Sequence, residues 1–325
     1  MLKLGKLSNE ELSRIVLNKL PRIREEVLLR PGIGEDCAAL RIDGVCVISS
    51  DPITAANSSA GSLAVNVSCN DIAAAGAMPI AIMITLLVPP TSSLSEIEQI
   101  MNSVSLAASE LDVEVVGGHT EVTDAVNRTV ISSTVIGIPV GEFCINTSDA
   151  KVGDQLIMTK YAGIEGTAII AADFKERASK ILNIEELTFA AGLLNQISVV
   201  KEGLIASRAG AHAMHDATEG GVLGAAYEMA QAANLGVSIE TEKISVLPIT
   251  EKLTTALKLN PLRLISSGCM LIAASPDSNI AQKLNEQGIN ASIIGEFTNG
   301  EMLEKTKGKK IALAPPSKDE LYKLF

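Results

Sequence analysis

The chain has 325 residues, of which 47% are apolar and only 2% aromatic, and its formal net charge at pH 7 is −11. A chain of this length exceeds the usual single domain, so we expect two domains, each with its own aliphatic core. The acidic balance argues against non-specific binding to nucleic acid or to an anionic membrane. The most apolar run, residues 80–88, is too short to span a bilayer, and the N-terminus lacks the apolar stretch of a secretory signal. We therefore expect a cytoplasmic protein that binds neither membranes nor nucleic acid.

The first half of the chain predicts an alternation of helices and strands. The S-x-x-E capping boxes that begin at Ser8 and Ser93 each predict the start of a helix with one apolar face. A further helix is expected over residues 61–75, because Gly76 is typical of a helix C-terminus. We expect strands at residues 45–48, 80–88, 113–116 and 129–136. This order predicts a mixed α/β or α+β domain.

A domain boundary is predicted after residue 148, where the chain reaches the junction-like sequence Lys-Val-Gly-Asp at 151–154. Beyond it, strands and helices mix in a similar manner. We expect strands at residues 156–159, 211–214, 237–240, 270–274 and 292–294, and helices at 221–233 and 279–286. The prediction is an N-terminal domain of residues 1–148 and a C-terminal domain of residues 149–325.

Three aspartates in the first half are candidates for a metal site. Asp36 follows a glycine-spaced loop, Asp51 follows a predicted strand, and Asp71 lies beside Asn70 on an otherwise apolar helix. Mg²⁺ takes carboxylate oxygens together with substrate phosphates, so the three could form one site if the fold brings them together. Each also has a structural explanation: a solvated turn for Asp36, a Ser-Ser-Asp-Pro turn for Asp51, and hydrogen bonding to the core for Asp71.

Residues 117–122 read Gly-Gly-His-Thr-Glu-Val directly after a predicted strand. Glycines at a strand end allow backbone N–H groups to approach a phosphate or a base closely. His119 could contact a nucleotide, bind a metal, or satisfy a partly buried turn. The chain contains neither GxxxxGK[ST] nor GxGxxG, so neither a P-loop nor a Rossmann site is expected.

In the second half, residues 215–221 form a polar, glycine-bearing turn that opens directly into a predicted helix. Asp216 or Thr218 could cap that helix, and helix N-termini also favour anions. Alternatively, Asp216 could add a fourth carboxylate to a metal site.

The five cysteines show no CxxC or zinc-like spacing. We expect reduced and mostly buried thiols. Cys37 and Cys69 adjoin the acidic positions, where neighbouring carboxylates would raise a thiol pKa, so both are interpreted as small buried residues.

Five stretches together resemble the AIR synthetase-like (PurM-like) ATP-binding superfamily. They are GIGEDCAAL, VISSDPI, LAVNVSCNDIAAAGAMP, VVGGHTEVT and HDATEGGVLGAAYEMA, in the order expected of that family. The resemblance begins near Gly32 and covers nearly the whole chain. It implies a two-domain α/β fold in which an N-terminal half-barrel sheet domain forms a homodimer. A second α/β domain would close a cleft that contains ATP and several Mg²⁺ ions.

The resemblance also implies roles for single residues. It implies Mg²⁺ ligands at Asp36, Asp51, Asp71 and Asp216, with Ser50 beside them. It implies nucleotide contacts from Asp51, Asp71, Gly117, Gly118 and His119. For His119, a contact with the nucleotide suits the side chain better than tight ligation of Mg²⁺.

Within the superfamily, the HDATEGG stretch resembles the hydrogenase maturation member HypE more than thiamine-monophosphate kinase. HypE ends in a cysteine that carries a carbamoyl group, whereas this sequence ends in Leu-Tyr-Lys-Leu-Phe. No cysteine precedes Cys37, so the N-terminal thiol of selenophosphate synthetase is missing as well.

We therefore expect a Mg²⁺-dependent enzyme that transfers the γ-phosphoryl group of ATP to an oxygen of an unidentified acceptor. No catalytic residue is assigned. Two alternatives remain: a small-molecule kinase of the thiamine-monophosphate type, and a nucleotide-binding partner of hydrogenase maturation proteins that does not turn over.

Overall fold

The computed structural model describes residues 4–33, 37–54, 59–141 and 144–324, which fold into two compact units. The first unit contains residues 1–72 and 77–139, and the second contains residues 73–76 and 140–325. The predicted boundary after residue 148 falls in the segment between the last strand of the first unit and the first strand of the second.

The strands are β1 (Gly5–Lys6), β2 (Val27–Leu29), β3 (Ala39–Leu40), β4 (Val47–Ile53), β5 (Ala77–Val88), β6 (Glu114–Val122), β7 (Val130–Pro139), β8 (Gln155–Thr159), β9 (Ala213–Asp216), β10 (Gly236–Glu240), β11 (Met270–Ala274), β12 (Ala291–Thr298), β13 (Leu303–Thr306) and β14 (Lys309–Ala312). The helices are α1 (Asn9–Ile15), α2 (Ala60–Ala74), α3 (Leu94–Glu110), α4 (Ile164–Asp173), α5 (Lys175–Ala178), α6 (Ile184–Gly192), α7 (Val200–Arg208), α8 (Gly221–Ala232), α9 (Pro248–Leu257) and α10 (Ile280–Glu286).

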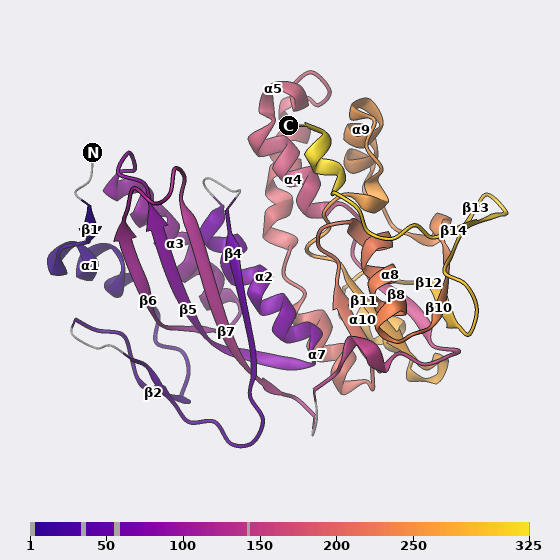
Figure 1. Ribbon diagram of the computed structural model, residues 1–325, viewed down its shortest axis with the longest axis horizontal. Coiled ribbons are helices and arrows are strands. Elements are labelled where there is room, and N and C mark those ends of the chain that lie inside the picture. Colours follow the sequence, from indigo (N-terminus) through magenta and orange to yellow (C-terminus); the bar gives the residue numbers. More distant parts are fainter. Residues whose placement is uncertain (1–3, 34–36, 55–58, 142–143, 325) are drawn as a thin grey trace. The chain divides into compact units, whose positions relative to one another are not determined.

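Described strands of the first unit form a five-stranded sheet in the order β1-β6-β5-β7-β4. β5 and β6 run parallel, and the other neighbours are antiparallel. Helices α2 and α3 cover one face of this sheet (Figure 1). The core of this layer is aliphatic, as the composition predicts, and includes Leu63, Ile72, Ile82, Leu86, Ile97 and Val104. The layer places the C-terminal part of α2 against the edge strand β4.

The predicted helix starts are confirmed at both capping boxes. Ser8 and Ser93 each accept a hydrogen bond from the backbone N–H three residues later, and the glutamate at that position accepts one from the serine N–H. α2 ends at Ala74, and Gly76 follows with a φ of 70°, a conformation that favours glycine.

The predicted Ser-Ser-Asp-Pro turn is wrong, because β4 continues through Asp51 and Pro52 to Ile53. β4 is an edge strand, and proline is tolerated there because one side of the strand has no hydrogen-bonding neighbour. Asp51 therefore lies within a strand rather than after one.

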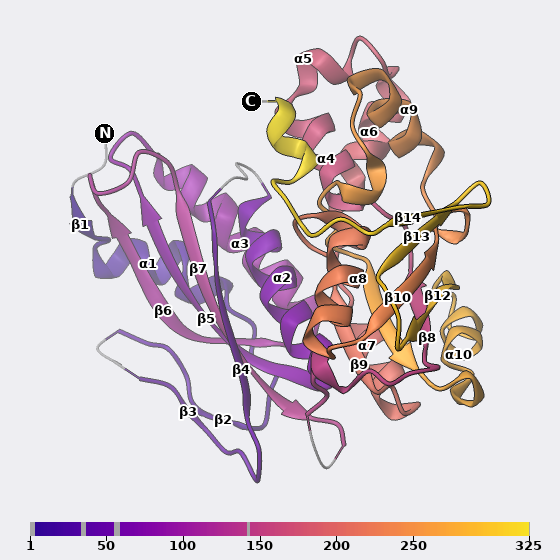
Figure 2. The ribbon, with the colours of Figure 1, turned by 45° about the vertical axis from the view of Figure 1, so that its right-hand side comes forward.

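The second unit contains a seven-stranded sheet in the order β14-β13-β10-β12-β8-β11-β9 (Figure 2). Only β10 and β13 run parallel within this described sheet. Helix α8 packs on the sheet through a core that includes Leu223, Met229, Leu271 and Phe297. The sheet and α8 place the turn at residues 217–220, which connects β9 to α8.

The prediction of mostly buried thiols is wrong, although all five cysteines are free. Cys69 and Cys269 are buried, whereas Cys37 and Cys46 are exposed. Burial raises the pKa of the Cys69 thiol, and the charge of Asp71 raises it further. The Cys69 thiol is therefore unreactive, as predicted, but Cys37 is not a buried residue.

Candidate functional site

Ser49 connects the carboxylates of Asp51 and Asp71. Its hydroxyl lies 2.6 Å from Asp71 Oδ2, and 3.4 Å from Asp51 Oδ2. Because side chains alternate between the faces of a strand, Ser49 and Asp51 share the face of β4 that meets α2. The structure thus brings together two of the predicted ligands, around a hydroxyl that the sequence analysis missed. The alternation of side chains along β4 is the signal that could have identified it.

Buried hydroxyls fix α2 against the neighbouring strand β7. Ser68 Oγ lies 2.7 Å from Ser133 Oγ, and the Ser133 hydroxyl lies 3.0 Å from the carbonyl oxygen of Ala64. Both serines are fully buried. Ser68 and Asp71 lie about one helical turn apart, so their side chains lie on the same side of α2. These contacts therefore hold the Asp71 carboxylate at β4.

Ser50 lies on the opposite face of β4 from Asp51. Its hydroxyl is 2.8 Å from Thr134 Oγ1 and 3.1 Å from the carbonyl oxygen of Ser133. Side chains of consecutive strand residues point to opposite faces, so those of Ser50 and Asp51 cannot reach one ion together. The hydroxyl beside the two carboxylates is that of Ser49, and we do not carry Ser50 into the proposed metal site.

Gly118 lies in the middle of β6, so the predicted strand end at residue 116 is wrong. The register between β5 and β6 shifts between Ile82 and Met83, where β6 contains one extra residue. Gly118 has a φ of 145°, and a Cβ there would lie 1.8 Å from the carbonyl oxygen of Ile84. The close approach of two strands therefore requires this glycine, whatever else it contacts.

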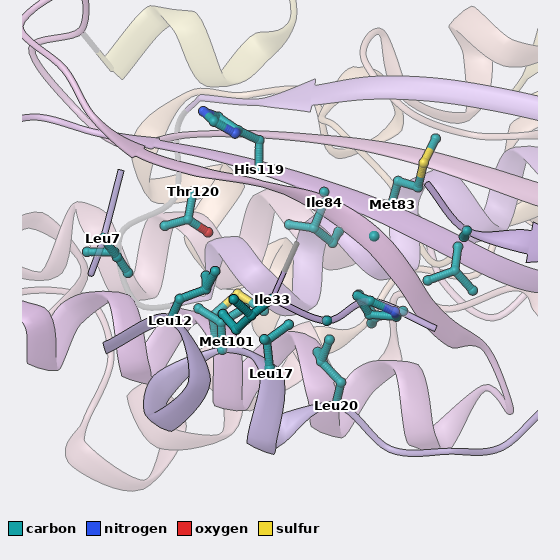
Figure 3. Close-up of a pocket in the computed structure, with 18 of the residues that line it drawn as sticks. Leu7, Leu12, Leu17, Leu20, Ile33, Met83, Ile84, Met101, His119 and Thr120 are labelled. Carbon is teal, nitrogen blue, oxygen red and sulfur yellow. The ribbon is translucent and has the colours of Figure 1, made fainter. Parts of the chain in front are cut away.

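A cavity of about 430 Å³ runs along β6 and is lined in part by Gly117, Gly118 and His119. Figure 3 shows the leucines of the N-terminal helical segment gathered with Met101 on one side of the strands, and His119 pointing to the other side. His119 Nε2 lies 3.1 Å from Glu121 Oε2. The predicted nucleotide-binding residues of β6 thus do line a cavity, most of whose lining side chains are apolar.

The β6 residues and the β4 carboxylates are not neighbours within the first unit. β5 and β7 lie between β6 and β4, which separates β6 from β4 by roughly 14 Å at the usual strand spacing. Cross-strand pairing places His119, Thr85, Ser132 and Pro52 in one row. His119 therefore shares the face of Pro52, opposite to that of Asp51.

Asp216 ends β9 in the second unit and is buried. The neighbouring His215 donates or accepts a hydrogen bond with Glu228 over 3.1 Å, and its Nδ1 lies 4.0 Å from Asp216. Burial alone would lower the pKa of His215, but the hydrogen bond to Glu228 and the charges of Asp216 and Glu228 outweigh it and raise the pKa.

The predicted capping of α8 by Asp216 or Thr218 is wrong. Gly220 is the N-cap residue, with a φ of 84°, so neither Asp216 nor Thr218 occupies the N-cap position. Instead, the Gly220 N–H donates to Asp319 Oδ2 over 2.9 Å, from a segment far along the chain.

Glu165, on the first turn of α4, is a buried carboxyl that the sequence analysis missed. It accepts hydrogen bonds from Ser267, while its Oε2 atom has no hydrogen-bond partner. Burial raises the pKa of Glu165 to about 7, and the charges of Asp319 and Asp216 add to this effect. The sequence around Glu165 did not mark it as a candidate, because its hydrogen bonds come from Ser267, which lies far along the chain.

Asp36 lies outside the described residues. Within the described part of the chain, no group of three or more His, Cys, Asp or Glu side chains is arranged to bind a metal ion. The pair Asp51 and Asp71 nevertheless fits Mg²⁺, which commonly takes one or two protein carboxylates together with substrate phosphates and water.

Residues 34–139 match the AIR synthase related protein, N-terminal domain, and residues 151–306 match the C-terminal domain of the same family. The chain belongs to the AIR synthase-related family. The resemblance inferred from the sequence and the predicted two-domain α/β fold are both confirmed.

Among relatives, a protein of Methanocaldococcus jannaschii named as a hydrogenase expression/formation protein is 28% identical, over 96% of this chain and 94% of that protein. Carbamoyl dehydratase HypE of Bradyrhizobium diazoefficiens is 28% identical, over 73% of this chain and 68% of that enzyme. This AIR synthase-related chain is thus HypE-like in sequence.

Solved structures share the fold. HypE in complex with ATP gives a TM-score of 0.83 at 20% identity, covering 98% of this chain and 97% of that one. Thiamine-monophosphate kinase from Stenotrophomonas maltophilia gives 0.72 at 20% identity, covering 90% and 93%. In the described residues of our protein, no helix has the length and apolar character needed to cross a membrane.

Proposed function

We propose that this AIR synthase-related protein acts in hydrogenase maturation as a HypE-like enzyme that binds ATP with Mg²⁺. The γ-phosphoryl group of ATP is transferred to an oxygen of an acceptor. The observation that carries the proposal is the cluster of Ser49, Asp51 and Asp71, in which a strand and a helix present two carboxylates around one hydroxyl. Two similarities support ATP binding. The chain is similar in sequence to a relative named carbamoyl dehydratase HypE, and its fold is similar to that of HypE in complex with ATP.

In this proposal Asp51 and Asp71 bind Mg²⁺, and Asp36 and Asp216 remain proposed as further ligands. A bound Mg²⁺ ion neutralises the charge that develops on a transferring phosphoryl group. Ser49 holds Asp71 in place through its 2.6 Å hydrogen bond, so the carboxylate need not reorganise when the ion binds. Metal ions also offset the net charge of −11, which would otherwise repel a polyphosphate.

Gly117, Gly118 and His119 form a second part of the proposed nucleotide site, along the cavity beside β6. Because β6 lies roughly 14 Å from β4 and His119 faces away from Asp51, one copy of the first unit cannot place both groups on the same phosphates.

A homodimer is also part of the proposal. On the sheet face opposite α2, Ile48 is 64% and Met83 40% exposed, and Ser50 and Thr134 lie between them. An exposed apolar sheet face of this kind suits burial against a second copy. Sedimentation velocity tests it: a dimer that Ile48→Lys converts to a monomer supports this face, and a monomeric parent contradicts it.

The remaining parts of the proposal are a cytoplasmic location and contact with hydrogenase maturation proteins. The fold is shared with the HypE chain of a HypE-HypF complex, at a TM-score of 0.73 and 20% identity. Retention of a HypF-type maturation protein on the immobilised full chain would support this contact, and a free-standing kinase should retain none.

Measurement of ADP release tests the reaction. With Mg²⁺ and ATP, the parent protein should release ADP slowly, and a true acceptor should accelerate it. Thiamine monophosphate as acceptor tests the alternative kinase, and a carbamoylated thiol tests the HypE-like reaction. ADP release that Asp71→Asn leaves unchanged would refute the assigned site. Binding of ATP with no ADP release under any condition would favour the non-catalytic alternative.

A further inference from the structure

The two strands at one end of the seven-stranded sheet, β13 and β14, form a hairpin of residues 303–312 that we call the basic hairpin. Figures 1 and 2 show it at one edge of the second unit. Four of the residues 305–310 are lysines, although the whole chain has a net charge of −11. They are Lys305, Lys307, Lys309 and Lys310. The basic hairpin therefore concentrates positive charge on an otherwise acidic protein.

The four ammonium groups form no ion pair with a carboxylate of the described residues, and three of the four lysines are exposed. Three carboxylates lie on the same or neighbouring segments, but each is bound to another group: Glu240 to Lys243 over 2.9 Å, Glu304 to Arg263 over 3.4 Å, and Glu242 to the backbone N–H of Lys307. The basic hairpin thus keeps an excess of positive charge that attracts an anionic partner.

Lys305 and Lys310 lie directly opposite each other on β13 and β14. Like charges at such cross-strand positions destabilise a sheet. Glu240 lies beside Lys305 on β10, but its carboxylate is paired with Lys243. Lysines on an edge strand commonly prevent unwanted strand pairing, which would account for the lysines of β14. It does not account for Lys305, because β13 is an inner strand that pairs with both β10 and β14. A bound carboxylate would relieve the repulsion between these two lysines.

The backbone of β14 is open on one side, because this strand is the last of the described sheet and all of its residues are exposed. The Leu313 N–H donates to the carbonyl oxygen of Met302 over 2.9 Å, which fixes the phase of the antiparallel ladder. Hydrogen-bonding groups of successive residues alternate in direction, so the N–H and C=O groups of Lys310 and Ala312 point away from β13. Ile311 lies between them and is 51% exposed. An extended peptide can pair with such an edge, whereas a nucleic acid or a lipid headgroup cannot form a β-ladder.

We propose that the basic hairpin is a docking surface for an acidic, extended segment of a partner protein. The segment adds as a further strand at the open edge of β14. One of its carboxylates lies opposite Lys310, on the face that Lys305 shares, and an apolar side chain packs on Ile311. This inference goes beyond the proposed function and does not depend on it, because neither ATP nor Mg²⁺ takes part.

The test is fluorescence anisotropy of a labelled peptide of alternating glutamate and valine, titrated with the full chain in about 0.1 M sodium chloride, where distant charges are screened. The parent should bind the peptide. Lys310→Glu should weaken binding at least about tenfold, because it places a like charge opposite the peptide carboxylate. Lys283→Glu, at an exposed lysine of α10, makes the same change in net charge and should leave the affinity within about twofold. No binding by the parent, or equal weakening in both variants, overturns the proposal.

The unfolding temperature of Lys310→Glu separates lost binding from lost structure. This substitution replaces the repulsion with Lys305 by an attraction, so the variant should unfold at a higher temperature than the parent. Binding that is lost in a more stable protein is lost at the surface itself.

Ala312→Pro tests strand addition without any change of charge. It removes an N–H that points away from β13, and an edge strand tolerates proline at such a position. We expect at least about fivefold weaker peptide binding, because one hydrogen bond of the new ladder is lost. Binding equal to that of the parent would contradict strand addition.

Titrations with a labelled single-stranded oligonucleotide and with phosphatidylserine vesicles distinguish a protein segment from other polyanions. The net charge of −11 opposes binding to both, so each should bind far more weakly than the acidic peptide. Oligonucleotide or vesicle binding as tight as that of the peptide, and equally sensitive to Lys310→Glu, would overturn the assignment of a protein partner.

Discussion

Ser49 Oγ lies 2.6 Å from Asp71 Oδ2, a hydrogen bond that ties the edge strand β4 to the buried helix α2. The same hydroxyl lies 3.4 Å from Asp51 Oδ2. Two carboxylates from different elements therefore share one hydroxyl where α2 meets β4.

Asp71→Asn should remove Mg²⁺-dependent nucleotide binding without unfolding the protein. The amide has nearly the same shape and can still accept from Ser49, but it lacks the charge that Mg²⁺ requires. We expect the affinity for Mg-ATP to fall by at least about 100-fold, or roughly 2.8 kcal/mol, in equilibrium binding measurements. Asp124→Asn, at an exposed aspartate of the same unit, is the matched control. Unchanged affinity in Asp71→Asn would mean that the site lies elsewhere.

Ser49→Ala and Ser50→Ala form a matched pair of substitutions on one strand. Ser49→Ala removes the hydrogen bond that positions Asp71 and should weaken Mg-ATP binding about tenfold. Ser50→Ala removes a hydroxyl on the opposite face, bonded to Thr134, and should leave Mg-ATP affinity within about twofold. Titration of both variants with Mg-ATP checks the order, and the reverse order would restore Ser50 as the metal-facing residue.

Gly118→Ala should destabilise the first unit severely, whereas Gly117→Ala should not. A Cβ at position 118 would meet the carbonyl oxygen of Ile84 at 1.8 Å, so the two strands must separate, at a cost of about 3 kcal/mol or more. At position 117 the nearest atom is Met83 Cγ at 3.8 Å, and we expect a loss of about 1 kcal/mol or less. Urea unfolding measures both. Equal losses would show that the strands do not approach as closely as described.

Glu165→Gln should stabilise the second unit at alkaline pH and have little effect at acidic pH. The pKa of Glu165 is about 7 in the folded protein and 4.5 in its ordinary state, so only the unfolded chain releases the proton between these values. Stability of the parent therefore falls as pH rises from about 4.5 to 7, by roughly 3 kcal/mol, and glutamine avoids this loss. Thermal unfolding at pH 5 and pH 8 compares the two proteins, with the exposed Glu176→Gln as control. Stabilisation that is the same at both pH values would rule out ionisation as the cause.

The sequence predicted the helix starts well because their signals are local. The capping boxes at Ser8 and Ser93 need only four consecutive residues, and both form as expected. Gly76 likewise marks the end of α2 through its own positive φ. Such features depend on neighbours along the chain and not on the packing of distant elements.

Features that depend on distant elements escaped prediction. Pro52 suggested a turn, but the place of β4 at the sheet edge lets the strand pass through it. Gly118 suggested a strand end, but its conformation is dictated by the approach of β5. Asp319 rather than Asp216 or Thr218 accepts the hydrogen bond from the α8 N-terminus, across a long stretch of sequence.

The candidate site could be predicted only in part, because its geometry also depends on elements that are distant in the sequence. The resemblance identified Asp51 and Asp71, and the structure places them together. It assigned Ser50 rather than Ser49, because the strand was expected to end at residue 48 and the alternation that pairs Ser49 with Asp51 was therefore not applied.

Thermal unfolding of the parent protein with Mg²⁺ and ATP, before and after addition of a chelator, tests the central claim most directly. A ligand that binds the folded state at 100 times its dissociation constant adds about 2.7 kcal/mol of stability. Our account predicts a clear rise in the unfolding temperature with Mg-ATP, absent with Mg²⁺ alone and lost on chelation. No rise at millimolar Mg-ATP, or a rise that survives the chelator, would contradict a Mg²⁺-dependent nucleotide site at Asp51 and Asp71.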